Sequence, residues 1–244
     1  MKKLVVLGYA AALLGPLAHA ETGYYLVSVY GEEGQAAIDY KYWNAHYRGR
    51  TVAAPEVGIG YGVTSRWYTN VSAMWVKLNG SAGHWVETSW QNDYLLTQGQ
   101  YAVDVALHTE IGRPRDRADG YSLEWGPVLQ TEIGRTQLNA NLFFQRDYRV
   151  SAPGAAPGPT ELSYQLQVKH RWKSWFQPGI QVLGEVGKWN DWAPLRQQSH
   201  RAGPVVLGHY DIAGHEWRYE FGYLVGRNSA RAAKNFTMRV QYLF

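Results

Sequence analysis

Acidic residues gather around one histidine in the middle of the chain, with residue types that suit cation binding. His108 is flanked by Asp104, Glu110, Glu124 and Glu132. Carboxylate oxygens and imidazole nitrogens are common ligands of divalent cations. On paired strands, however, hairpin neighbours with these spacings would lie at different depths. The sequence therefore favours separate solvated charges over a cation site, and it predicts no metal and no cofactor.

Serine and histidine could together supply the nucleophile and the base of a lipid-facing hydrolase. A His-x-Ser pattern would place both side chains on one face of a strand. No serine lies two residues after any of His84, His108, His170, His200, His209 or His215. Ser199 and His200 are adjacent and would face opposite sides. A pair from two different strands stays open, so the sequence predicts no enzyme and keeps a hydrolase as an alternative.

The elements that must position these residues are strands, because polar and apolar residues alternate over segments of about ten residues. The alternation predicts an all-β chain in one domain, with twelve antiparallel strands, or alternatively ten or fourteen. The predicted strands are 34–44, 56–65, 67–77, 85–95, 100–112, 121–133, 136–148, 162–172, 177–189, 203–211, 216–226 and 235–244.

The aromatic composition indicates a membrane environment. The chain has 18 Tyr and 11 Trp but only 6 Phe, and Tyr and Trp favour boundaries between apolar and aqueous surroundings. No apolar run after residue 20 is long enough for a membrane-spanning helix. A transmembrane β-barrel satisfies both observations, because only alternate residues of each strand face lipid. Most tryptophans are expected in two aromatic girdles, while Trp43 and Trp189 could instead face the interior.

The N-terminus has the three parts of a secretory signal peptide. Lys2 and Lys3 precede an apolar stretch that ends in Ala18-His19-Ala20, which predicts cleavage after residue 20. Residues 21–33 are expected to form a periplasmic or interior lead-in, and residues 34–244 the barrel. The chain has no cysteine, so disulfides do not stabilise it. The mature formal charge, (24 − 2) − 20 = +2, does not suggest nucleic-acid binding.

The connections between the predicted strands alternate in length. Short turns are expected around residues 65–66, 97–99, 134–135, 173–175 and 213–214. Longer loops are expected at 46–55, 114–120, 150–160 and 190–200, with a shorter one at 227–234. Short turns at one rim and long loops at the other are typical of outer-membrane barrels.

The last strand ends with apolar residues at alternate positions, namely Phe236, Met238, Val240, Tyr242 and Phe244. This ending resembles the C-terminal signature of Gram-negative outer-membrane β-barrel proteins. The resemblance implies export to the cell outer membrane, contact with its lipids and recognition of this strand by the barrel-assembly machinery. A second stretch resembles a hairpin of putative-transporter barrels of the phenol-degradation pathway type, namely Glu56-Val57-Gly58-Ile59-Gly60-Tyr61-Gly62-Val63-Thr64-Ser65-Arg66-Trp67.

The polar faces of the strands would line the interior of such a barrel. The charged and titratable residues expected there are Asp39, Lys41, Glu56, Glu87, Asp93, Asp104, His108, Glu110, Glu124, Glu132, Lys169, Arg171, Glu185, Arg218, Glu220 and Arg239. Their mixed signs, with acids in excess, predict passive passage of small polar solutes with weak or no cation preference.

A plugged structural or adhesive barrel is the first alternative to a channel. Phe143, Leu183, Val205 and Leu207 would also face inward, and apolar interior residues favour partial plugging. The transported solute and the oligomeric state do not follow from the sequence.

Overall fold

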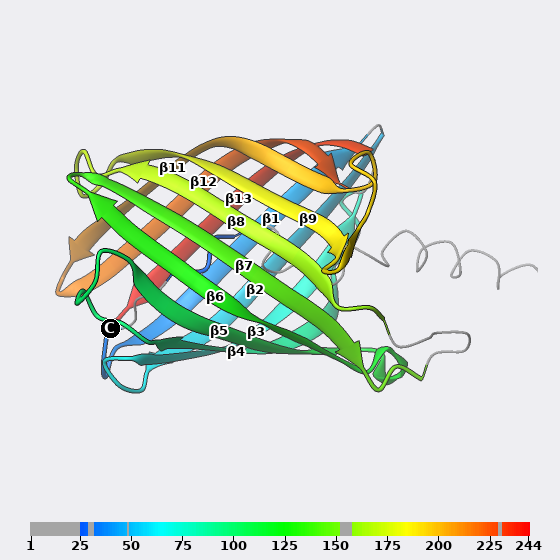
Figure 1. Ribbon diagram of the computed structural model, residues 1–244, viewed down its shortest axis with the longest axis horizontal. Helices are drawn as coiled ribbons and strands as arrows, with labels where there is room; N and C mark the ends of the chain where they lie inside the picture. The colour runs from blue at the N-terminus through cyan, green and yellow to red at the C-terminus, as the bar shows by residue number, and fades with distance from the viewer. Residues whose placement is uncertain (1–24, 29–31, 48, 152–157, 229–230) are drawn as a thin grey trace, which may run out of the picture.

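The computed structural model describes residues 25–28, 32–47, 49–151, 158–228 and 231–244, and it is a closed antiparallel β-barrel (Figure 1). The predicted signal peptide lies outside these residues. The strands are β1 (Ala36–Tyr47), β2 (Arg50–Gly62), β3 (Trp67–Leu78), β4 (His84–Leu95), β5 (Asp104–Pro114), β6 (Tyr121–Ile133), β7 (Thr136–Tyr148), β8 (Glu161–His170), β9 (Gln177–Lys188), β10 (Asp191–Trp192), β11 (Ser199–Ile212), β12 (His215–Asn228) and β13 (Arg231–Leu243). A 3₁₀ helix, η1 (Arg117–Asp119), precedes β6.

Twelve of these strands form the barrel wall, which confirms the predicted number. Each pairs with its neighbours in the chain, and the last strand, β13, pairs antiparallel with β1 to close the ring. The two-residue β10 pairs only with β9 and lies outside the ring. At the seam, the backbone N–H of Ala36 donates to the oxygen of Phe244 at 2.9 Å, and the N–H of Phe244 donates back at 3.0 Å. The sheet therefore has no open edge that lipid would leave unpaired.

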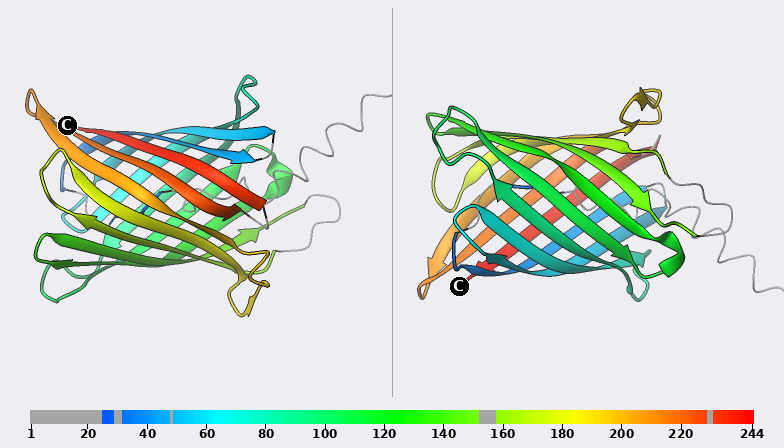
Figure 2. Two further views of the ribbon diagram at one scale, coloured as in Figure 1. Left: turned by 90° about the horizontal axis from the view of Figure 1, so that it is seen from above. Right: turned by 60° about the horizontal axis from the view of Figure 1, so that its bottom comes forward.

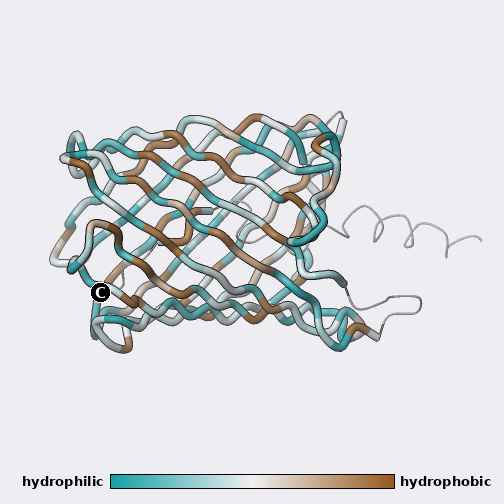
Figure 3. The backbone as a smooth tube through the Cα atoms, in the orientation of Figure 1, coloured by the Kyte–Doolittle hydropathy of each residue, from teal (hydrophilic) through white to brown (hydrophobic). Residues whose placement is uncertain are grey.

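Hydrophilic and hydrophobic residues alternate along the strands of the wall (Figure 3), and their burial indicates that they face the interior and the outside in turn. The outward positions expose large apolar side chains around the circumference, including Ile38, Val57, Ile59, Val71, Leu107, Leu142, Leu166, Ile180, Phe221 and Val225. A continuous apolar belt of this kind is the surface by which a barrel contacts lipid. Among the described residues, no helix is long and apolar enough to cross a membrane.

Exposed aromatic residues cluster near the strand ends. At the rim that carries the C-terminus, here called the C-terminal rim (Figure 2), they are Trp67, Trp172, Trp175, Trp217 and Phe244. Trp85, Trp189 and Trp192 are exposed toward the opposite rim. Trp189 contacts the outward-facing Phe144, so it lies outside the barrel. Trp43 is 2% exposed and lies inside, within an apolar cluster.

Two of the predicted loops are wrong, because strands continue through them. Residues 46–47 and 50–55 form the ends of β1 and β2, which pair as far as Tyr47 and Arg50. Residues 227–228 and 231–234 likewise belong to β12 and β13, which pair as far as Asn228 and Arg231. The longer connections 115–120 and 189–198, and residues 149–151 and 158–160, do lie at the rim opposite the C-terminus (Figure 1).

Pro55 lies within the first of these segments. It pairs with Tyr42 of β1, but the described β2–β3 register passes from Ala53 to Glu56 without a partner for it. The missing N–H of proline therefore costs no ladder hydrogen bond on that side. The strand can continue through this proline without distortion of the barrel.

Candidate functional site

The charged residues expected in the lumen fall into three groups by burial. The buried members are Asp39, Lys41, Glu56, Glu87, Asp93, His108, Glu110 and Glu124. The partly buried members are Asp104, Lys169, Glu185, Arg218, Glu220 and Arg239, and the exposed ones, at the C-terminal rim, are Glu132 and Arg171. Their role in lining a pore stays a prediction, since burial alone does not show passage.

Most of the lumen cations form ion pairs with carboxylates. Lys41 Nζ lies 2.9 Å from Glu56 Oε1. Arg201 Nη2 lies 2.7 Å from Glu185 Oε1. Arg201 is 1% exposed, yet it was missed in the sequence because it precedes the predicted strand 203–211. The extended alternation of β11, in which Ser199 and Arg201 share the inward face, was the signal that could have revealed it.

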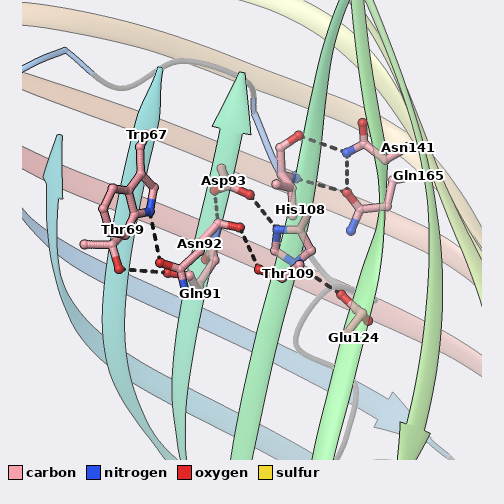
Figure 4. Close-up of polar contacts among 11 residues, drawn as sticks. Trp67, Thr69, Gln91, Asn92, Asp93, His108, Thr109, Glu124, Asn141 and Gln165 are labelled. Carbon is pink, nitrogen blue, oxygen red and sulfur yellow. Dashed lines mark hydrogen bonds and ion pairs between the residues drawn. The ribbon is translucent and has the colours of Figure 1, made fainter. Parts of the chain in front are cut away.

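His108 lies between two carboxylates in the barrel wall formed by β4, β5 and β6 (Figure 4). Its Nδ1 atom is 2.6 Å from Asp93 Oδ1, and its Nε2 atom is 3.4 Å from Glu124 Oε1. Phe143 packs on the ring with a centroid separation of 4.9 Å. The sequence placed His108 among the acids Asp104, Glu110, Glu124 and Glu132, but only Glu124 of these contacts the ring. A buried imidazole between carboxylates is a structural ion-pair group that stabilises the wall.

Replacing His108 with leucine is expected to destabilise the barrel. The substitution leaves Asp93 and Glu124 buried without the ring between them, which should lower the free energy of unfolding by about 3–5 kcal/mol. Urea unfolding in lipid vesicles, followed by tryptophan fluorescence, measures the loss. The triple variant D93N/H108L/E124Q removes the uncompensated charges as well and should recover much of the stability. Equal stability of native and H108L barrels would contradict this prediction.

An inner segment, defined as residues 25–28, runs inside the barrel. The backbone N–H of Val27 donates to Gln165 Oε1 at 3.0 Å, and Gln165 Nε2 donates to the oxygen of Tyr25 at 2.6 Å. Asn141 Nδ2 donates to the oxygen of Val27 at 2.9 Å. Figure 4 shows Asn141 and Gln165 side by side on the strands that hold this segment. The segment is therefore fixed to β7 and β8 through its backbone.

Apolar side chains fill part of the lumen around the inner segment. Tyr25 packs in a cluster with Trp43, Ala45, Val52, Ala54, Met74 and Val76. Val27 packs in a second cluster with Leu95, Ala106, Val128 and Phe143. A third cluster joins Leu183, Val205 and Leu224, with Leu207 against it. These clusters contain the four apolar residues that the sequence placed inside, and they narrow the barrel.

A polar cavity remains beside these clusters. It has a volume of about 450 Å³, and its charged lining residues are Lys169, Arg171, Arg218, Arg239, Glu216 and Glu220, together with five glutamines. Leu26 and Ser28 of the inner segment form part of its wall. A smaller cavity of about 50 Å³ lies between the inner segment and a wall that includes Asp93 and Glu110. The larger cavity falls in the size range of small-molecule sites, about 300–1,000 Å³.

The other two chemistries considered are a metal site and a serine–histidine pair. No group of three or more His, Cys, Asp or Glu residues among them has the arrangement of a metal site. His200 contacts Tyr164, with Nδ1 3.0 Å from the phenolic oxygen, and Gln198, with Nε2 2.7 Å from Oε1. Ser199 is buried on the inner face of β11. His200 therefore lacks, among these contacts, the serine hydroxyl that a hydrolase of this type would need.

Comparisons of sequence identify no relative. No protein-family model matches the chain, and no curated protein matches it significantly. The fold therefore has to be compared through structures.

Solved structures of outer-membrane β-barrels resemble the chain in fold. An outer-membrane channel from Pseudomonas putida F1 aligns with a TM-score of 0.60 at 10% identity, over 90% of this chain and 98% of that one. The KdgM porin aligns at 0.56 and 9% identity, over 85% and 99%. The translocator domain of the autotransporter NalP from Neisseria meningitidis aligns at 0.53 and 11% identity, over 98% and 96%. The chain thus has the fold of an outer-membrane β-barrel.

Proposed function

We propose that this protein is a passive outer-membrane channel for small polar solutes. The observation that carries the proposal is the cavity of about 450 Å³, lined by charged residues and glutamines, inside a closed barrel with an apolar outer belt. Water and ions are stabilised by such a lining, whereas an apolar lining would exclude them. Two structural neighbours are described as a porin and a channel, which supports the proposal without identifying a solute.

The proposal contains no catalytic step, and it places the protein in the outer membrane of a Gram-negative cell after cleavage of the signal peptide. Its partners would be the lipids around the apolar belt and, during biogenesis, the barrel-assembly machinery. The outward-facing Phe236, Met238, Val240 and Tyr242, with the exposed Phe244, would form the strand that this machinery recognises.

The test is the single-channel conductance of the folded mature chain in a planar lipid bilayer. Current steps of stable size are expected. In a salt gradient, the reversal potential should be near zero or should indicate a weak preference for cations. Weak selectivity follows because many lumen charges are neutralised in pairs, such as Lys41 with Glu56. Strong anion selectivity would contradict the expected charge balance.

A plugged structural barrel is the second candidate, and the inner segment favours it. Three hydrogen bonds hold this segment in the lumen, next to three apolar clusters. A silent bilayer would support this candidate over the channel if the protein is shown to be folded. The folding check is electrophoresis, in which an unheated barrel should migrate faster than a boiled one.

A further inference from the structure

Three of the four cations at the large cavity are already neutralised by carboxylates. Arg239 Nη2 lies 2.6 Å from Asp39 Oδ2, and its Nε lies 3.1 Å from Oδ1. Arg218 forms a bidentate pair with Glu216, in which Nε donates to Oε1 at 2.8 Å and Nη2 donates to Oε2 at 2.7 Å. Arg171 Nη1 donates to Glu132 Oε2 at 2.8 Å, and its Nη2 contacts the other oxygen. Paired guanidinium and carboxylate groups of this geometry leave little net charge for a ligand.

One cation and one carboxylate at the cavity are left without such a partner. Lys169 of β8 forms no ion pair within 4.0 Å and no hydrogen bond with any residue that the structure describes. Glu220 of β12 accepts one long hydrogen bond, of 3.4 Å, from Gln167 Nε2. Strands β9 and β11 separate β8 from β12 in the wall. The cavity thus presents an ammonium group and a carboxylate that do not contact each other.

The neutral lining also has unused hydrogen-bonding capacity. Gln167 is 2% exposed, and its Oε1 atom has no hydrogen-bond partner among the described residues. This side chain lines the cavity together with Lys169 and Glu220. A buried acceptor without a partner is unfavourable, by about 1–3 kcal/mol. Because this oxygen is itself buried, it is not open to a ligand in the cavity.

We propose that this cavity binds small zwitterionic solutes, with the ligand carboxylate at Lys169 and the ligand ammonium group at Glu220. The inference deepens the proposed channel function and rests on it. Lys169 would attract a simple anion, but Glu220 would repel it. Glu220 would attract a simple cation, but Lys169 would repel it. Only a solute with both charges matches the two groups that the protein leaves unpaired.

Binding can be measured without any current, by saturation-transfer NMR on the folded barrel in detergent micelles. The probe is β-alanine, compared with propionate, propylammonium and propionamide, which have the same three carbon atoms but carry one charge or none. β-Alanine is expected to bind at least about tenfold more tightly than each of the three, the ratio that one charge-assisted hydrogen bond supplies.

Variants at the two ends of the site separate this inference from general charge effects. Lys169→Gln and Glu220→Gln should each weaken β-alanine binding about tenfold. The exchange Lys169→Glu with Glu220→Lys keeps the net charge and should restore binding, because a zwitterion can bind in the reverse orientation. Lys77→Gln removes an exposed lysine that does not line the cavity and should change nothing. Faster migration of the unheated sample verifies that each variant is folded.

Three results would overturn the inference. They are equal binding of propionate and β-alanine, binding unaffected by Glu220→Gln, or no β-alanine binding by the folded native barrel. Conductance is a separate readout, so the two proposals fail separately. A barrel that conducts ions but does not bind β-alanine would overturn only the zwitterion site. A silent barrel that binds β-alanine through Lys169 and Glu220 supports the site and overturns the transport proposal.

Discussion

A barrel carrying Asn141→Ala and Gln165→Ala is expected to pass a larger ionic current than the native protein. These two side chains make the three hydrogen bonds that hold the inner segment. Without them, the backbone groups of Tyr25 and Val27 would be buried without partners, at a cost of about 1–3 kcal/mol each. A total of about 3 kcal/mol shifts the balance between bound and released segment by roughly two orders of magnitude.

Single-channel recording measures the effect, and the chain offers a matched control. Asn139 is the preceding inward residue of β7, and it bonds Gln130 and Gln137 but makes no bond to the inner segment in the described structure. Asn139→Ala should therefore leave the step size unchanged. If the native barrel is silent, the double variant should open it. An unchanged current in the folded double variant would show that the segment does not limit passage.

The second large effect is expected at the seam that closes the barrel. Asp39 of β1 is 1% exposed, and it accepts hydrogen bonds from Arg239 and Gln241 of β13. Replacing Asp39 with leucine leaves Arg239 in the interior without its partner. The free energy of unfolding should fall by about 3–5 kcal/mol, and the fraction of chains that migrate as folded barrel should fall with it.

The exposed ion pair of Arg171 at the C-terminal rim provides the control for the stability loss expected at the seam. Arg171 pairs with Glu132, but the two side chains are 43% and 42% exposed, and exposed pairs contribute about 0–1 kcal/mol. Arg171→Leu should therefore cost at most about 1 kcal/mol in urea unfolding. The exchange Asp39→Arg with Arg239→Asp should recover part of the stability lost at the seam. Equal losses at the seam and at the rim would refute a special role for the closing pair.

The wall of the barrel was predictable because its signal is local. Alternation along β7 or β13 needs only neighbouring residues, and it identified the strands and their inward faces before any pairing was known. The ends of strands were less predictable. Residues 46–55 were expected to form a loop, but most of them belong to β1 and β2, and the β2–β3 ladder is interrupted at Pro55.

The contacts inside the barrel were not predictable, because they depend on register between strands. The sequence grouped His108 with four acids on its own and the following strand. The structure pairs Asp93 directly opposite His108 in the β4–β5 register, which brings this carboxylate to the ring. The sequence predicted residues 21–33 as a periplasmic or interior lead-in and did not decide between the two. Residues 25–28 lie inside, and their position depends on Asn141 and Gln165 far along the sequence.

The inner segment also has a mechanical consequence for the barrel. Tyr25 packs against the wall of β1, β2 and β3, while Val27 packs and bonds to the wall that contains β7 and β8. The segment thus connects two sides of the barrel wall across the lumen. A hollow barrel of twelve strands can flatten into an oval when lateral pressure in the bilayer changes. Contacts of the inner segment with both sides of the wall should oppose such flattening of this barrel.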